Sequence, residues 1–108
     1  MSEGGFERVA PCGDFKEGTP VSLRLSTGEQ VCLVRVNGEV FGMAEDCPLC
    51  EFPMSDGAII EDYIIECSTH GTQFDVRDGS LVEQPGDIQL RTYEVEVRDD
   101  QVWVQPHE

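Results

Sequence analysis

The amino-acid sequence predicts an all-β domain, on three observations. Short runs rich in Val, Ile, Leu and Phe alternate apolar with polar residues, which is the period of a half-buried strand. Gly, Asn, Asp and Pro stand between these runs, where tight turns need them. No window keeps the apolar period of an amphipathic helix, and only residues 11–17 leave room for a short one. With 108 residues the chain has the size of one domain, so we expect residues 1–108 to form a single unit.

The first part of the chain predicts strands that end in a tight hairpin. Strands are expected at residues 6–9, 21–25, 30–36 and 39–43. Asn37-Gly38 is the sharpest turn signal in the sequence, because both residues tolerate the positive φ that a two-residue hairpin turn requires. Residues 30–36 should therefore fold back onto residues 39–43 as an antiparallel pair.

The second part predicts shorter strands joined by polar turns. Residues 57–66 predict two strands around a Glu61-Asp62 turn, and later strands are expected at 74–76, 80–82, 90–97 and 102–104. Alternation within 90–97 places Tyr93, Val95 and Val97 on one face and Thr92, Glu94 and Glu96 on the other. Asp99-Asp100 should form the last hairpin turn.

The charge balance narrows the range of partners. The chain has 22 acidic and 7 basic side chains and a formal net charge of -15. Such an excess of carboxylates repels nucleic-acid phosphates and anionic lipid, and it favours encounter with basic protein surfaces. No apolar run reaches the roughly 20 residues of a membrane span, and residues 1–5 lack the features of a secretory signal. We expect a cytoplasmic protein that binds neither nucleic acid nor membranes.

Cysteine and histidine residues form two short motifs. Cys47-Pro48-Leu49-Cys50 is a CxxC, and after sixteen residues Cys67-Ser68-Thr69-His70 is a CxxH. An odd total of five cysteines in a cytoplasmic chain disfavours a disulfide framework. Each two-residue gap lets a turn aim two side chains at one point, so the spacing predicts a metal site at Cys47, Cys50, Cys67 and His70. The alternative is a set of buried thiols with a surface histidine.

The remaining cysteines and histidine have structural or incidental roles in this interpretation. Cys32 lies in an apolar, strand-like run, and buried cysteine usually behaves as a small hydrophobic side chain. Cys12 lies in a Pro-Cys-Gly-Asp turn, and His107 lies in a polar C-terminal segment.

The second motif continues as Cys67-Ser68-Thr69-His70-Gly71-Thr72-Gln73-Phe74, followed by Gly79 and Pro85. This CxxHGxxF pattern resembles the second cluster loop of Rieske-type ferredoxins. The resemblance extends over nearly the whole chain, including Asp46-Cys47-Pro48, which opens the first loop, and Met54-Ser55-Asp56-Gly57, which closes it. It implies a Rieske-like antiparallel β-sandwich with an inserted cluster-binding subdomain at about residues 44–86. It also implies a 2Fe-2S cluster.

The first loop departs from the family pattern. In the family this loop is CxH, so that two cysteines hold one iron and two histidines hold the other. Here Leu49 stands at the histidine position and Cys50 follows it. By analogy, Cys47 and Cys67 would bind one iron, and Cys50 and His70 the other. A thiolate in place of an imidazole adds negative charge, so we expect a potential below that of ordinary Rieske ferredoxins.

The resemblance also assigns supporting roles around the cluster. Gly71 and Thr72 would donate hydrogen bonds from a backbone amide and a hydroxyl. Glu45, Asp46 and Glu51 are candidate docking charges, although a merely solvated face is equally compatible with them.

The function implied by the resemblance is one-electron transfer without substrate chemistry. The chain would carry electrons from a flavin-dependent reductase to a terminal oxygenase or another oxidoreductase with a basic docking surface. No dinucleotide fingerprint is present, so the reductant must come from a partner. Alternatives are a structural Cys3His zinc module and a cluster-free, Rieske-like subunit of a reductase complex. Nucleophilic catalysis by Cys50 or Cys67 with His70 has little support, because no orienting acid has a recognisable spacing.

Overall fold

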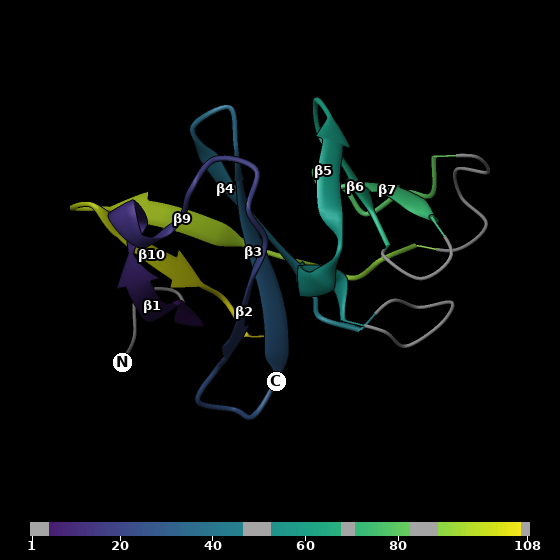
Figure 1. Cartoon of the computed structure of the whole chain (residues 1–108). Coiled ribbons are helices and arrows are strands. Elements are labelled where there is room, and N and C mark those ends of the chain that lie inside the picture. The colour runs from purple at the N-terminus through teal and green to yellow at the C-terminus, as the bar shows by residue number, and fades with distance from the viewer. Residues whose placement is uncertain (1–4, 47–52, 68–70, 83–88, 107–108) are drawn as a thin grey trace.

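The computed structural model describes residues 5–46, 53–67, 71–82 and 89–106, and its strands form three antiparallel sheets (Figure 1). The strands are β1 (Glu7–Pro11), β2 (Val21–Arg24), β3 (Gln30–Val36), β4 (Glu39–Ala44), β5 (Ala58–Glu61), β6 (Ile64–Glu66), β7 (Gln73–Asp75), β8 (Thr92–Tyr93), β9 (Val95–Arg98) and β10 (Gln101–Val104). Two short 3-10 turns, η2 (Cys12–Asp14) and η3 (Met54–Asp56), complete the described elements. The predicted all-β class is confirmed.

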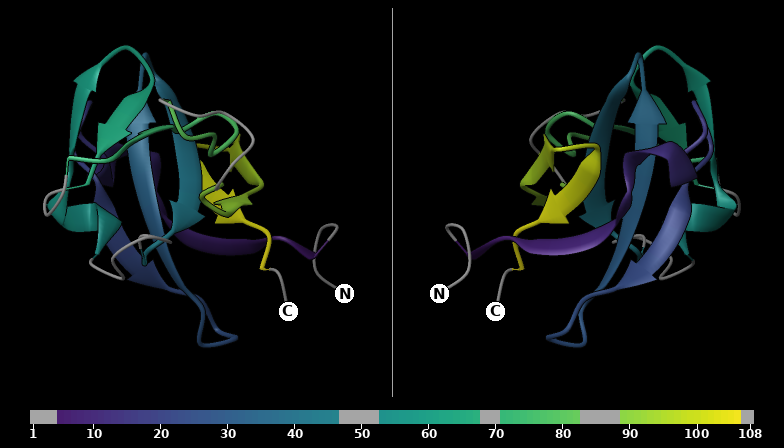
Figure 2. Two further views of the ribbon diagram at one scale, coloured as in Figure 1. Left: turned by 90° about the vertical axis from the view of Figure 1, so that its right-hand side faces the viewer. Right: turned by 90° about the vertical axis from the view of Figure 1, so that its left-hand side faces the viewer.

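The sheets have the orders β1-β10-β9, β2-β3-β4-β8 and β5-β6-β7. We call them the first, middle and third sheet. The middle sheet lies between the other two (Figure 1). The side views show β1 and β10, from opposite ends of the chain, side by side in the first sheet (Figure 2). In the described parts of the chain, no helix has the length and apolar character that crossing a bilayer requires.

Strand β3 separates two apolar cores. Its residues Cys32 and Val34 pack towards the third sheet, and Val31 and Leu33 pack with the first sheet. Successive side chains of a strand point to opposite faces, so the part of a strand that lies between two cores is apolar at consecutive positions, as residues 31–34 are here. All four of these residues have no exposed surface. This double burial explains why the β3 sequence shows a continuous apolar run rather than an alternation.

The hairpin predicted at Asn37-Gly38 is confirmed. Asn37 has φ 53 and Gly38 has φ 81, and β3 pairs with β4 from Val36 opposite Glu39 onwards. The Asp99-Asp100 turn is confirmed in the same way, with φ 51 and 63 between β9 and β10.

One predicted strand is interrupted. The structure divides residues 90–97 at Glu94, so that β8 pairs with β4 in the middle sheet and β9 pairs with β10 in the first sheet. Tyr93 and Val95 both pack on the core of the first sheet. Val97 shares the face of Val95 within β9, opposite the buried Val102 of β10, although Val97 itself is 49% exposed. The alternation therefore continues although the chain changes sheets at Glu94.

Three other expectations need smaller corrections. The helix considered at residues 11–17 is only the 3-10 turn η2. The turn expected at Glu61-Asp62 lies one residue later, since Glu61 ends β5 and Asp62 takes φ 43. The strand expected at residues 80–82 is reduced to isolated bridges, in which Leu81 pairs with Phe74.

Tyr63 fixes the third sheet against the middle sheet. Its ring meets the ring of Phe41 on β4 edge-on at 5.7 Å, and the Arg77 guanidinium lies 4.4 Å above it. Arg77 also donates two hydrogen bonds, of 2.7 and 3.0 Å, to the Asp75 carboxylate. These bonds lower the pKa of Asp75. The third sheet is thus held at a defined place beside β4.

Gly79 stands where two chain segments approach too closely for any side chain. It has φ +78, and a Cβ there would lie 1.9 Å from the carbonyl oxygen of Leu90. We expect Gly79→Ala to lower the free energy of unfolding by about 3 kcal/mol or more, because backbone must move. Gly18 is the matched control, since its φ is +76 and a Cβ there would meet nothing within 4 Å. Gly18→Ala should cost only about 1 kcal/mol. Urea unfolding of both variants checks this, and equal losses would contradict the close approach.

Candidate metal centre

Of the four predicted ligands, the structure describes Cys67. Cys47, Cys50 and His70 lie outside the described residues, so the chain is described on both sides of each ligand loop but not through it. Cys67 directly follows β6 and is 1% exposed. Within the described residues, no three His, Cys, Asp or Glu side chains come together as a metal site.

The second loop is closed by backbone hydrogen bonds. The Cys67 N–H donates to the Thr72 carbonyl at 2.8 Å, and the Gly71 N–H donates to the Cys67 carbonyl at 3.0 Å. Gly71 takes φ +68, a conformation that favours glycine. The structure therefore uses Gly71 and the Thr72 carbonyl to bring β6 and β7 together around Cys67. Their predicted role as hydrogen-bond donors to a cluster stays a prediction.

The first loop is closed by a side chain as well as by backbone contacts. Glu45 directly follows β4, and its carboxylate accepts hydrogen bonds from the Ser55 hydroxyl at 2.6 Å and the Ser55 N–H at 3.2 Å. Asp46 and Pro53 form an isolated antiparallel bridge beside this contact. Sequence reasoning missed Ser55, although Met54-Ser55-Asp56-Gly57 belongs to the resemblance.

The sequence suggests Glu45 as a docking charge, and the structure shows that this prediction is wrong. Glu45 is 7% exposed, and its carboxylate is bound to Ser55 rather than presented to solvent. Asp46, the next residue, is exposed, and Glu51 lies outside the described residues. The sequence shows that a carboxylate stands beside the loop, but not whether it points inwards.

The structural role predicted for Cys32 is confirmed. Cys32 is fully buried on β3, and this burial, together with the nearby charge of Glu45, raises the pKa of its thiol far above the ordinary value. Cys32 therefore packs as a small apolar side chain in the core between the middle and third sheets. Cys12 is half-buried in η2 and packs on the core of the first sheet.

The surroundings of Cys67 suit a sulfur-ligated metal. Cys67 belongs to the core between the middle and third sheets, where Met54, Ile65 and Phe74 have no exposed surface. Such packing keeps water from the buried side of the thiolate. Thiolates are soft ligands that bind iron-sulfur clusters and zinc, and imidazole also binds both iron and zinc, so the predicted donor set fits iron-sulfur centres and zinc alike. The donor set and the described setting of Cys67 therefore fit a 2Fe-2S cluster.

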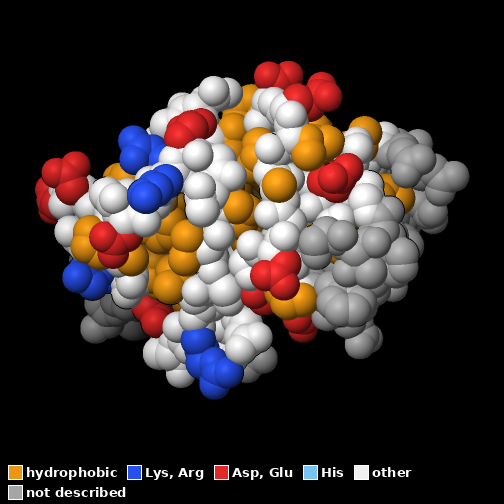
Figure 3. Space-filling view, viewed as in Figure 1, with side chains coloured by type: hydrophobic (Ala, Val, Ile, Leu, Met, Phe, Trp, Pro, Cys, Tyr) orange, Lys and Arg blue, Asp and Glu red, His pale blue; other side chains and the backbone are white. Residues whose placement is uncertain are grey.

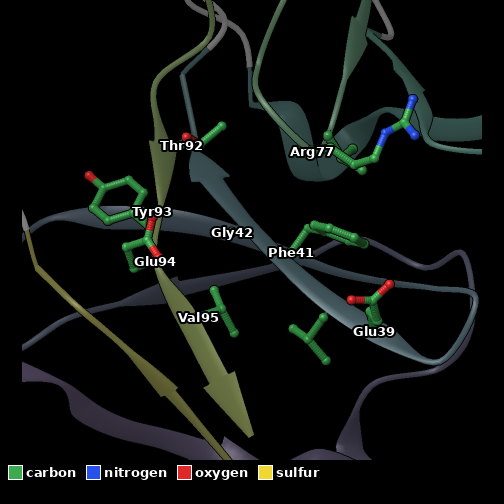
Figure 4. Close-up of a pocket in the computed structure, with 10 residues that line it drawn as sticks. Glu39, Phe41, Gly42, Arg77, Thr92, Tyr93, Glu94 and Val95 are labelled. Atoms are coloured by element: carbon green, nitrogen blue, oxygen red, sulfur yellow. The ribbon is translucent and has the colours of Figure 1, made fainter. Parts of the chain in front are cut away.

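The described residues also form a shallow depression, which does not include Cys67. It lies where β4 passes β8 and β9, and Figure 4 shows Phe41, Gly42, Tyr93 and Val95 along it. A Cβ on Gly42 would come within 2.9 Å of the Val95 side chain, so this glycine permits β4 and β9 to pack closely. Among the described residues that line the depression, Cys67 is not found.

Charge is distributed unevenly along the chain. Residues 44–86 contain ten acidic residues and one basic residue, a net charge of -9, so the remaining residues carry -6. In the face shown in Figure 3, acidic side chains are visible over β5, and basic side chains appear at the left and lower edges of the molecule. The part that holds the candidate ligands is thus the more acidic one.

Comparison with known proteins gives a consistent result. The Rieske-like 2Fe-2S domain family matches residues 5–105. The ferredoxin component of the p-cumate 2,3-dioxygenase system of Pseudomonas putida is 32% identical over 91 residues, 84% of this chain and 77% of that protein. The ferredoxin component of biphenyl 2,3-dioxygenase of Rhodococcus jostii (strain RHA1) is 33% identical over 98 residues, 90% of this chain and 89% of that protein.

Comparison with solved structures also gives a dioxygenase ferredoxin as a similar protein. The structure of the ferredoxin of carbazole 1,9a-dioxygenase from Nocardioides aromaticivorans IC177 matches with a TM-score of 0.85 and 30% identity. The match covers 94% of this chain and 97% of that one.

Proposed function

Because the chain belongs to the Rieske-like 2Fe-2S domain family, we propose that it is the ferredoxin-type electron carrier of an oxygenase system. It would take electrons from a flavin-dependent reductase and pass them to a terminal oxygenase, without substrate chemistry of its own. The observation that carries this proposal is the extent of the likeness, which covers 97% of a dioxygenase ferredoxin at a TM-score of 0.85.

The proposed ligands are three cysteines and one histidine. Cys47 and Cys67 would hold one iron, and Cys50 and His70 the other, with residues 44–86 as the cluster-binding subdomain. When bound, the cluster accepts and returns one electron. The chain's own part is to fix the ligand loops to the ends of β4 and β6 and to keep water from the buried side of Cys67, as the packing of Met54 and Phe74 supports.

The proposed partner surface is basic. The net charge of -9 in residues 44–86 would steer the cluster end of the molecule towards a positive surface, and Asp46 is an exposed carboxylate next to the first loop. We place the protein in the cytoplasm, because an odd set of thiols with a ligand pattern fits a reducing compartment.

The first test is the visible spectrum of protein purified without oxygen from cells with intact iron-sulfur assembly. We expect absorption bands that bleach with dithionite, and about two iron atoms per chain. Metal analysis on the same sample separates the alternatives. A colourless protein with zinc would support the Cys3His zinc module, and a metal-free protein would support the cluster-free subunit, so either result would contradict the carrier function.

A further inference from the structure

We propose that Glu45 and Ser55 are positioning residues that hold the first ligand loop closed whether or not a cluster is bound. We call their contact the loop clamp. The consequence for the cluster rests on the proposed function, but the clamp itself involves only described residues. It would present Cys47 and Cys50 on a loop whose two ends are already fixed.

The clamp ties together the segments on either side of residues 47–52. On one side, the Glu45 N–H donates to the Gln30 carbonyl at 3.3 Å, which anchors Glu45 to the start of β3. Across the loop, the Met54 N–H donates to the Glu45 carbonyl at 2.5 Å, and Ser55 donates to the Glu45 carboxylate twice. The Asp46 and Pro53 bridge continues the same antiparallel contact. Main chain and side chain thus close the loop at adjacent positions.

Burial makes the clamp costly to open. Among the described residues, Glu45 is the charged side chain that is buried, and it is 7% exposed. Its carboxylate accepts hydrogen bonds from the hydroxyl and the N–H of Ser55. A buried carboxylate that loses its donors carries a large desolvation cost, so the closed arrangement is strongly favoured. Met54, next to Ser55, has no exposed surface and anchors the same segment in the core.

None of the clamp atoms belongs to a candidate ligand. The clamp therefore does not need the cluster. In this it differs from a loop whose two ends are held together only by a bound metal. Fixing both ends of a short loop in advance reduces the conformational entropy lost when its side chains bind. The second loop is closed by backbone groups of Cys67, Gly71 and Thr72, which a side-chain substitution does not remove. The first loop has the side-chain contact of Glu45 with Ser55 in addition to its backbone contacts, so the side-chain part of its closure can be tested by substitution.

The first measurement is amide hydrogen exchange on the metal-free protein. We expect the Met54 and Ser55 amides to be protected in the unsubstituted chain, and Glu45→Ala to lower their protection by about tenfold or more. Glu45→Gln should restore part of it, because the amide oxygen still accepts from Ser55. Val104→Ala, in the core of the first sheet, is the control for general destabilisation. Unprotected amides in the metal-free chain, or an equal loss in Val104→Ala, would overturn the proposal.

The second measurement is release of iron from the reconstituted protein to a chelator. Ser55→Ala should release iron about tenfold faster, as expected when a group supporting a ligand is lost, while Ser55→Thr keeps the hydroxyl and stays near the unsubstituted rate. Ser22→Ala on β2, an exposed serine, is the matched control. Equal rates in all variants would remove the link between clamp and cluster. A chain that takes up no iron contradicts the proposed function instead, and the exchange result then still decides the clamp.

Discussion

Replacing Cys50 by alanine is expected to abolish the stable visible chromophore, whereas Leu49→Ala leaves it in place. The family's usual histidine is missing at Leu49, and the chain has only two histidines, His70 and His107. If Cys50 is the fourth ligand, its removal leaves three, and the affinity for the cluster should fall by more than about 100-fold, beyond the effect of losing a supporting residue. Iron content and visible absorbance after identical reconstitution are the measurements.

Cys12→Ala is the matched control for this prediction. It also removes one thiol, but from the half-buried 3-10 turn η2, which packs on the core of the first sheet. We expect it to keep the iron content of the unsubstituted chain. If Cys50→Ala does the same, the fourth ligand is another group, and the ligation with three cysteines and one histidine is wrong.

The fold could be predicted wherever local chemistry decides it. Asn37-Gly38 and Asp99-Asp100 form hairpin turns because those residues tolerate positive φ, and no distant contact is needed. The break at Glu94 could not be predicted, because the alternation of residues 90–97 is the same whether the chain stays in one sheet or crosses to another. Pairing with β4 before Glu94 and with β10 after it is decided by tertiary packing.

In the candidate site, too, the sequence predicts what local chemistry decides and misses what distant contacts decide. The buried role of Cys32 followed from its place in an apolar run, and the structure confirms it. Glu45 was misjudged, because an acidic residue beside a loop is usually solvent-exposed and only its partner shows otherwise. That partner, Ser55, lies ten residues away across residues 47–52. A side-chain bond between two ends of a loop leaves no periodic signal in the sequence.

The double substitution Leu49→His with Cys50→Ala is expected to raise the reduction potential, because it rebuilds the family's CxH and replaces a thiolate by a neutral imidazole. Two-histidine Rieske centres lie at about -150 to +300 mV and all-cysteine plant-type centres near -400 mV. We expect the unsubstituted chain to fall between about -400 and -150 mV and the double variant to lie above about -150 mV. An anaerobic redox titration followed by visible absorbance measures both.

Glu61→Gln separates the ligand effect from the effect of net charge. It also removes one negative charge, but from an exposed residue. Glu61 lies at the turn between β5 and β6, whereas Cys67 follows the other end of β6. Exposed charges are screened within about 10 Å at ordinary salt, so its potential should stay close to that of the unsubstituted chain. A large rise in the double variant alone would assign the low potential to Cys50 as a ligand. Equal potentials in all three proteins would mean that Cys50 contributes no thiolate to the cluster.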